Sequence, residues 1–176
     1  MGHGYESFPW AQVVPAVRQG WLPDTISTDL YARSMNAALH DMPTVMSKFL
    51  ALGVPLADVV RMSTRAPAEV IHRPDLGRLA IGAVADIAVF RLRSGEFGFL
   101  DVRNLRRSGT QKLECELTLR EGRVVWDLNA RAAAPWRELG KPSDSASTSG
   151  VLPGPASHVE FAADQAPLPR PEGEIR

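Results

Sequence analysis

The sequence predicts an α/β fold followed by a tail that does not fold. Residues 1–75 carry apolar side chains at helical spacing around one short run with strand character. Residues 76–127 change to the period-two alternation of β-strands, and residues 141–176 hold six of the fourteen prolines without a sustained apolar period. The change of period predicts helices first and a sheet second. A chain of 176 residues is long enough for one domain, or for part of a larger one.

The first expected helix covers residues 8–19. Ser7 is the candidate N-cap and Gly20 the candidate C-terminal stop. Pro15 lies inside the span and is expected to kink it, because proline cannot donate the helical hydrogen bond. The apolar face of this helix consists of Trp10, Val13, Val14 and Val17.

A short strand is expected at Ile26–Thr28, and more helices follow it. The second helix opens at Met42-Pro43-Thr44 and stops at Gly53, because proline suits the first turn of a helix and glycine suits the residue after its end. Two shorter helices are expected over residues 55–64 and 66–72. The apolar face of the second helix consists of Val45, Phe49, Leu50 and Leu52.

The second half predicts a sheet. After two glycines that punctuate turns, Ile87–Phe90 is an apolar run that is typical of a buried strand. Residues 113–127, LECELTLREGRVVWD, predict a hairpin whose tight turn is Glu121-Gly122. Because leucines and Cys115 alternate with Glu114, Glu116 and Thr118, one face of this hairpin is expected to be buried and the other wet.

Composition excludes several classes of protein. Twenty basic and twenty acidic residues give zero net charge, without a basic block for nucleic acid. No apolar run approaches the roughly 20 residues that cross a bilayer, and the N-terminus lacks the pattern of a signal peptide. Cys115 is the only cysteine, which fits a reducing compartment. We therefore expect a cytoplasmic protein that binds neither nucleic acid nor membrane.

The tail, residues 140–176, cannot bury enough apolar surface to offset the entropy of ordering it. We expect it to be disordered. The alternative is a Pro-rich peptide that docks on a partner.

Few residues carry recognisable chemistry. The four histidines, His3, His40, His72 and His158, form no metal-binding motif such as His-x-His, and the sequence has no phosphate loop or nucleophile elbow. Asp29 ends the short expected strand, where a carboxylate can ligate a divalent metal and accept a proton. The alternative role of Asp29 is to cap the following turn.

Other candidates each have a structural alternative. Gly2 and Gly4 around His3 allow close approach to a ligand, or the segment is simply a mobile terminus. Lys48, beside Ser47, is expected to be solvated. Asp41 is expected to cap the second helix, and His72 to mark a helix end.

Several motifs, taken in order, resemble the C-terminal part of metal-dependent amidohydrolases. They are GHGYESF, PDTISTD and PTVMSKFLALG, then Thr-x-x-Pro-Ala at 64–68 and Gly-x-Leu-x-x-Gly-x-x-Ala-Asp-Ile at 77–87. The subgroup is the amidohydrolase/deacetylase one, which is similar to dihydroorotases. The resemblance covers residues 1 to about 139.

The resemblance implies a (β/α)8 barrel with one or two divalent metals, for which zinc is the family expectation, and a small β-sandwich. Residues 1–75 would be the last strand and helices of the barrel, residues 76–139 the sandwich, and residues 140–176 the tail. Asp29 matches the aspartate after the eighth strand, which implies a metal ligand and catalytic carboxylate. Gly2, His3 and Gly4 match a substrate-binding loop. The implied activity is deacetylase-type hydrolysis of small N-acyl or cyclic amides by metal-activated water.

The sequence departs from the family pattern in its ligands. The family's other metal ligands precede the region matched here, Lys48 cannot replace its bridging lysine, and Tyr31 stands where the subgroup often has histidine. We therefore expect a C-terminal segment that is inactive alone and that pairs with the missing N-terminal portion or with itself. The alternative is a non-catalytic remnant or pairing module, in which the Cys115 hairpin and the Ala-Asp-Ile strand dock on another chain by edge pairing.

Overall fold

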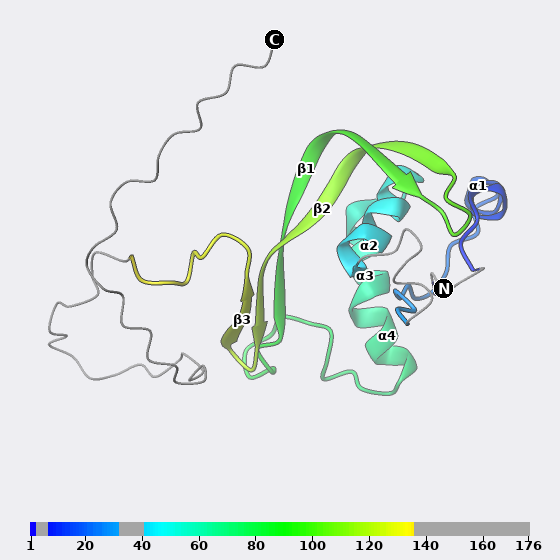
Figure 1. Cartoon of the computed structure of the whole chain (residues 1–176). Coiled ribbons are helices and arrows are strands. Elements are labelled where there is room, and N and C mark those ends of the chain that lie inside the picture. Colours follow the sequence, from blue (N-terminus) through cyan, green and yellow to red (C-terminus); the bar gives the residue numbers. More distant parts are fainter. Residues whose placement is uncertain (3–6, 32–40, 136–176) are drawn as a thin grey trace, which may run out of the picture. The chain divides into compact units, whose positions relative to one another are not determined.

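The computed structural model describes residues 1–2, 7–31 and 41–135. Its elements, in chain order, are helices followed by strands, as the change of period predicts (Figure 1). The helices are α1 (Trp10–Arg18), α2 (Met42–Ala51), α3 (Leu56–Ser63) and α4 (Arg65–Val70), and the strands are β1 (Ile87–Leu100), β2 (Arg106–Arg120) and β3 (Arg123–Asp127). The coarse prediction of a mixed α/β fold is confirmed. The expected tail lies outside the described residues.

α1 forms where it was expected, but not with the expected cap. Its N-cap residue is Pro9, and no side chain of the N-cap residue bonds to the helix, so the prediction that Ser7 caps it is wrong. The helix continues three residues beyond Pro15 to Arg18. Gly20 ends it in the left-handed region, at φ +86°, where glycine has no steric cost.

α2 is the central helix. Asp41 caps it as predicted, since its Oδ1 accepts a hydrogen bond of 2.8 Å from the N–H of Thr44. The predicted apolar face is buried at Val45, Phe49 and Leu50, but burial extends around the helix. It includes Met46, Ser47 and Lys48. The expectation that Lys48 is solvated is therefore wrong.

The strand expected at Ile26–Thr28 does not form. A strand needs a ladder of partners, and this segment has single contacts on its two sides. The N–H of Ile26 donates to the carbonyl of Met62, and the N–H of Ser27 donates to the carbonyl of Met1, both at 3.0 Å. In the part of the chain that the structure describes, the segment is therefore an extended stretch with single hydrogen bonds to its neighbours and no strand assignment.

The sheet has three antiparallel strands in the order β1-β2-β3. The predicted hairpin is confirmed as β2 and β3, with Glu121-Gly122 between them. Ile87–Phe90 does begin a strand, but that run is only partly buried or exposed, so the expectation of a buried strand is wrong. The strand continues to Leu100 as one arm of a long hairpin.

A β-bulge explains why the wet and dry faces of the predicted hairpin are not cleanly separated. Val89 pairs with Leu117 and Phe90 pairs with Cys115, which leaves Glu116 as the extra residue. Because a bulge interrupts the period of two, Glu116 is buried although the alternation predicts it to be wet.

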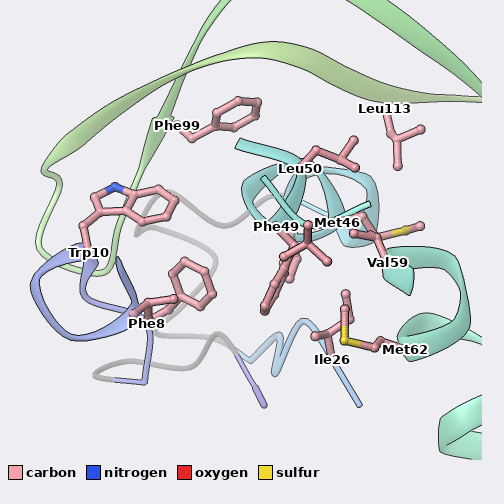
Figure 2. Close-up of a cluster of buried hydrophobic side chains, with 13 residues drawn as sticks. Phe8, Trp10, Ile26, Met46, Phe49, Leu50, Val59, Met62, Phe99 and Leu113 are labelled. Atoms are coloured by element: carbon pink, nitrogen blue, oxygen red, sulfur yellow. The ribbon is translucent and has the colours of Figure 1, made fainter. Parts of the chain in front are cut away.

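One hydrophobic cluster joins the helices to the sheet (Figure 2). α2 supplies its centre through Met46, Phe49 and Leu50, and the long hairpin covers it with Phe99 and Leu113. The remaining labelled members come from the N-terminal segment, the start of α1, the extended stretch and α3: Phe8, Trp10, Ile26, Val59 and Met62.

The barrel, the β-sandwich and their boundaries at residues 75 and 139 are not tested by the described residues and stay predictions. Within those residues, every helix is too short or too polar to cross a bilayer. The cytoplasmic location also stays a prediction.

Candidate functional site

The candidate site lies where two segments on either side of α1 meet. The N-terminal ammonium of Met1 donates to the carbonyl of Thr25, and the N–H of Ser27 donates to the carbonyl of Met1 at 3.0 Å. These two bonds bracket Ile26 in the pattern of a parallel strand pair. The connection between the two segments runs through α1, and neither segment is assigned as a strand.

This pairing brings Asp29 and Gly2 together. A Cβ atom added to Gly2 would lie 3.1 Å from the Cβ of Asp29 and 3.4 Å from its Oδ2. The side chain of Asp29 therefore packs over the backbone of Gly2 without room to spare. Asp29 is exposed and holds a left-handed backbone at φ +51°, which aspartate tolerates better than most residues.

The other residues expected here are only partly described. His3 and Gly4 lie outside the described residues, as does His40. Tyr31, two residues after Asp29, is 41% exposed. The structure thus brings Asp29 and Gly2 together and leaves the loop between Gly2 and Ser7 undescribed.

The described residues do not by themselves make a metal site. Across ranges 1–2, 7–31 and 41–135, no three histidine, cysteine, aspartate or glutamate side chains are grouped so that they could hold an ion. Asp29 could supply one oxygen donor, whereas zinc in proteins takes three or four protein ligands. A metal at Asp29 would therefore need donors from outside these residues.

Ser47 and Lys48 contact residues of the core. The hydroxyl of Ser47 donates to the carbonyl of Pro43 at 2.6 Å and accepts from the N–H of Leu113 at 2.8 Å. The Nζ of Lys48 lies 5.9 Å from the centre of the Phe8 ring. Burial lowers the pKa of Lys48 to about 8, although the negative charge of Asp101 acts to raise it. Ser47 thus holds α2 against β2.

His72 marks a helix end, as predicted. Its N–H donates to the carbonyl of Glu69 at 3.0 Å, and its backbone is left-handed at φ +57°. It lies in the exposed turn after α4, next to the Arg73–Asp75 ion pair.

Sequence reasoning missed two buried carboxylates. Asp101 follows β1, and Glu116 occupies the bulge in β2; Asp101 is fully buried and Glu116 nearly so. Asp101 could have been suspected, because Asp-Val-Arg-Asn between two strands is typical of an Asx turn. Glu116 had no such signal. It binds Arg91 at 2.7 Å and Arg131 at 3.1 Å.

A mostly apolar groove of about 780 Å³ lies between β1 and the helices α2 and α3, and Asp29 is not among the residues that line it. Alternate residues of β1, Ala88, Phe90 and Leu92, line one side of it. Methionines of α2, apolar residues of α3 and residues 75–79 line the rest. Its charged lining residues are Asp75, Arg78 and Asp86.

A family model and several known proteins match part of the chain. A family model described as "Amidohydrolase family" matches residues 25–126. "Deacetylase Atu3266" of Agrobacterium fabrum is 44% identical over 92 residues, which cover 52% of this chain and 23% of that protein. A deacetylase of Enterococcus faecalis is 31% identical over 125 residues, 70% of this chain and 34% of that protein.

Solved structures agree. The crystal structure of an adenine deaminase matches 72% of this chain and 34% of its own, with a TM-score of 0.67 and 31% identity. The crystal structure of a dihydroorotase matches 71% and 34%, with a TM-score of 0.65 and 33% identity. The chain thus spans about a quarter to a third of the length of these relatives.

Proposed function

The chain belongs to the amidohydrolase family, and from that premise we propose that it is the C-terminal segment of a metal-dependent hydrolase. The proposed reaction is cleavage of a carbon–nitrogen bond in a non-peptide amide by activated water, of the deacetylase type. The relatives from Agrobacterium fabrum and Enterococcus faecalis, both deacetylases, support this choice. The proposed substrates are small N-acyl compounds or cyclic amides.

The contact between Asp29 and Gly2 carries the proposal. A carboxylate at the end of a short parallel pairing, packed against a backbone that has no side chain, can accept a proton beside a closely bound ligand. We assign Asp29 as the catalytic carboxylate and one metal ligand. We assign Gly2, His3 and Gly4 as the substrate-binding loop.

The proposed metal is zinc, and its remaining ligands would come from outside the described residues. Zinc, when bound, supplies Lewis-acid chemistry and an acidic bound water. With Asp29 as one donor, the segment is proposed to be inactive alone. Its partner would be the N-terminal portion that its relatives contain, or a second copy.

A chimera tests the assignment of Asp29. Residues 1–135 would replace the matching third of the Enterococcus faecalis deacetylase, and hydrolysis of an N-acetyl substrate of that enzyme would be measured. The folded chimera should be active, and Asp29→Asn should lower kcat by about 10²–10⁴-fold, as for loss of a general base. Asp24→Asn is the matched control, because Asp24 is an exposed aspartate in the same segment.

Two outcomes would overturn the proposal. One is a chimera that is folded by circular dichroism but inactive. The other is an active chimera in which Asp29→Asn and Asp24→Asn behave alike.

A second function has one observation in its favour. Within the described residues, β1 has a paired strand on one side only, and its residues 88, 90 and 92 line the apolar groove. A non-catalytic module could accept an extended segment of another chain along this edge. Size exclusion chromatography with urea titration discriminates: a monomer with a steep cooperative transition counts against the pairing module.

A further inference from the structure

We propose that Asp101 is a positioning residue for the candidate site, which it affects through the N-terminus of α1. The proposal rests on the proposed function for the meaning of the contact between Asp29 and Gly2. The geometry of Asp101 stands apart from that function. Four observations carry the inference: the missing local cap of α1, the bonds of the carboxylate, the place of α1 between the two site segments, and burial.

α1 lacks a cap of its own. Its N-cap residue, Pro9, has no side-chain acceptor, and its first turn has no acidic residue. The N–H groups at the start of a helix need acceptors. Asp101 supplies one from a distance of 91 residues in sequence, because its Oδ2 accepts from the N–H of Trp10 at 2.9 Å in a buried setting.

The same carboxylate organises the turn between β1 and β2. Its Oδ1 accepts from the N–H groups of Arg103 at 2.8 Å and Leu105 at 2.9 Å. The carbonyl of Leu105 in turn accepts from the indole Nε1 of Trp10 at 2.9 Å. Trp10 is therefore bonded twice to one short turn, which fixes both the start of α1 and the direction of its first side chain.

The carboxyl group of Asp101 is buried and charged. Asp101 is 0% exposed. Burial acts to raise the pKa of its carboxyl, but the N–H groups of Trp10, Leu105 and Arg103 outweigh burial and hold the pKa below its ordinary range. A shift of α1 would take the N–H of Trp10 away from this buried Oδ2, which is costly for a carboxylate without contact to water.

What Asp101 positions follows from the chain order. α1 connects Met1–Gly2 to the stretch from Ile26 to Asp29, and these two segments meet through the hydrogen bond from Ser27 to Met1. The core also holds α1 near its start, where the ring centres of Phe8 and Trp10 lie 5.2 Å apart (Figure 2). A displaced α1 would therefore disturb the contact between Gly2 and Asp29.

Amide hydrogen exchange in the full chain tests the proposal without any assay of activity. The variants are Asp101→Ala and the milder Asp101→Asn, and the matched control is Asp127→Asn. Asp127 also accepts backbone hydrogen bonds in a turn, from the N–H groups of Asn129 and Ala132, but it is the last residue of β3. The probes are the amide of Ser27, the indole N–H of Trp10, and amides of α2 as a measure of global opening.

In the Asp101 variants, exchange at Ser27 and at the Trp10 indole should rise by about tenfold relative to α2, and the Asp127 variant should leave both unchanged. A rise at Ser27 that only parallels the rise in α2, or no rise at all, overturns the proposal. Should Asp101→Ala not fold, Asp101→Asn decides, because it keeps the size of the side chain and weakens its power to accept the bond from the N–H of Trp10.

The exchange experiment and the chimera experiment test the two proposals independently. Loss of Ser27 protection with an inactive chimera would retain the positioning role and reject the hydrolase. An active, Asp29-dependent chimera with unchanged Ser27 protection would retain the hydrolase and reject the role of Asp101.

Discussion

The side-chain oxygen of Ser47 accepts a 2.8 Å hydrogen bond from the backbone N–H of Leu113 and so fastens α2 to β2. Both groups are buried, and the Ser47 hydroxyl donates its own proton to the carbonyl of Pro43. This one hydroxyl satisfies a strand donor that the sheet does not use. It is a buried polar contact between α2 and β2, which are also joined by a hydrogen bond of 3.4 Å from the Nε of Arg107 to the carbonyl of Ala51.

Ser47→Ala should lower the free energy of unfolding by about 1–3 kcal/mol, because it leaves the buried N–H of Leu113 without its acceptor. Ser63→Ala is the matched control. Its hydroxyl donates only to the carbonyl of Val59, one turn back in its own helix, at 2.7 Å. Urea titration of both variants measures the difference. Equal losses in the two variants would mean that the bond to Leu113 adds no stability.

Lys48 predicts a dependence of stability on alkaline pH. Its pKa falls from 10.5 to about 8 in the folded state, so between those values the unfolded chain binds the extra proton. Stability therefore rises with pH across that window, and the cost of the buried charge is fully present below about pH 8. The shift corresponds to about 3 kcal/mol.

The variant that isolates this effect is Lys48→Met, which keeps the length of the side chain. Relative to wild type, it should be more stable by up to about 3 kcal/mol at pH 7, and the difference should narrow as pH rises toward 10.5. Thermal or urea unfolding of both proteins at matched pH gives the difference, in which the other titrating groups cancel. A gap that stays constant from pH 7 to 10 would contradict the buried charge.

Replacement of Gly77 is predicted to destabilise the fold. Its backbone is left-handed at φ +68°, and an added Cβ would lie 2.4 Å from the carbonyl oxygen of Thr64. Gly77→Ala should cost about 3 kcal/mol through strain and collision together. Gly53→Ala, at φ +88° but in open space, should cost about 1 kcal/mol because only the backbone is strained. Similar losses in urea titrations would show that the collision relaxes without cost.

Local signals in the sequence identified the features that depend on neighbours in the chain. The cap of α2 by Asp41 and the turn at Glu121-Gly122 are set by residues within a few positions, and both are found. The prediction of a strand at Ile26–Thr28 was wrong because a strand requires a paired neighbour. The sequence pattern of one segment does not show whether such a neighbour is present. The burial of Lys48 was not predicted, because the apolar period of a helix does not show how many of its faces are covered by other elements.

Features that depend on distant residues could not be read from pattern. Asp101 caps a helix 91 residues earlier in the chain, and Glu116 is buried because a bulge places it out of phase with its strand. The candidate site lies between these cases. The motif PDTISTD drew attention to Asp29, but only the fold brings its side chain against Gly2.

The last prediction concerns zinc and the chain by itself. Because Asp29 is one donor and the described residues hold no group of three possible ligands, zinc should bind the isolated chain with a Kd no tighter than about 1 μM at pH 7, compared with the far tighter binding of complete tetrahedral sites. Hydrolysis of N-acetyl substrates by the isolated chain should be undetectable. Isothermal titration calorimetry and a product assay measure both.

Variants separate weak binding at Asp29 from binding elsewhere. Asp29→Asn should weaken zinc binding further, because the amide is a poorer ligand than a carboxylate, whereas Asp24→Asn should not change it. Nanomolar binding with one zinc per chain, or turnover that Asp29→Asn abolishes, would show that the chain carries a complete site. In that case the remaining ligands would have to include residues outside the described ranges, where His3 and His40 are the first substitutions to make.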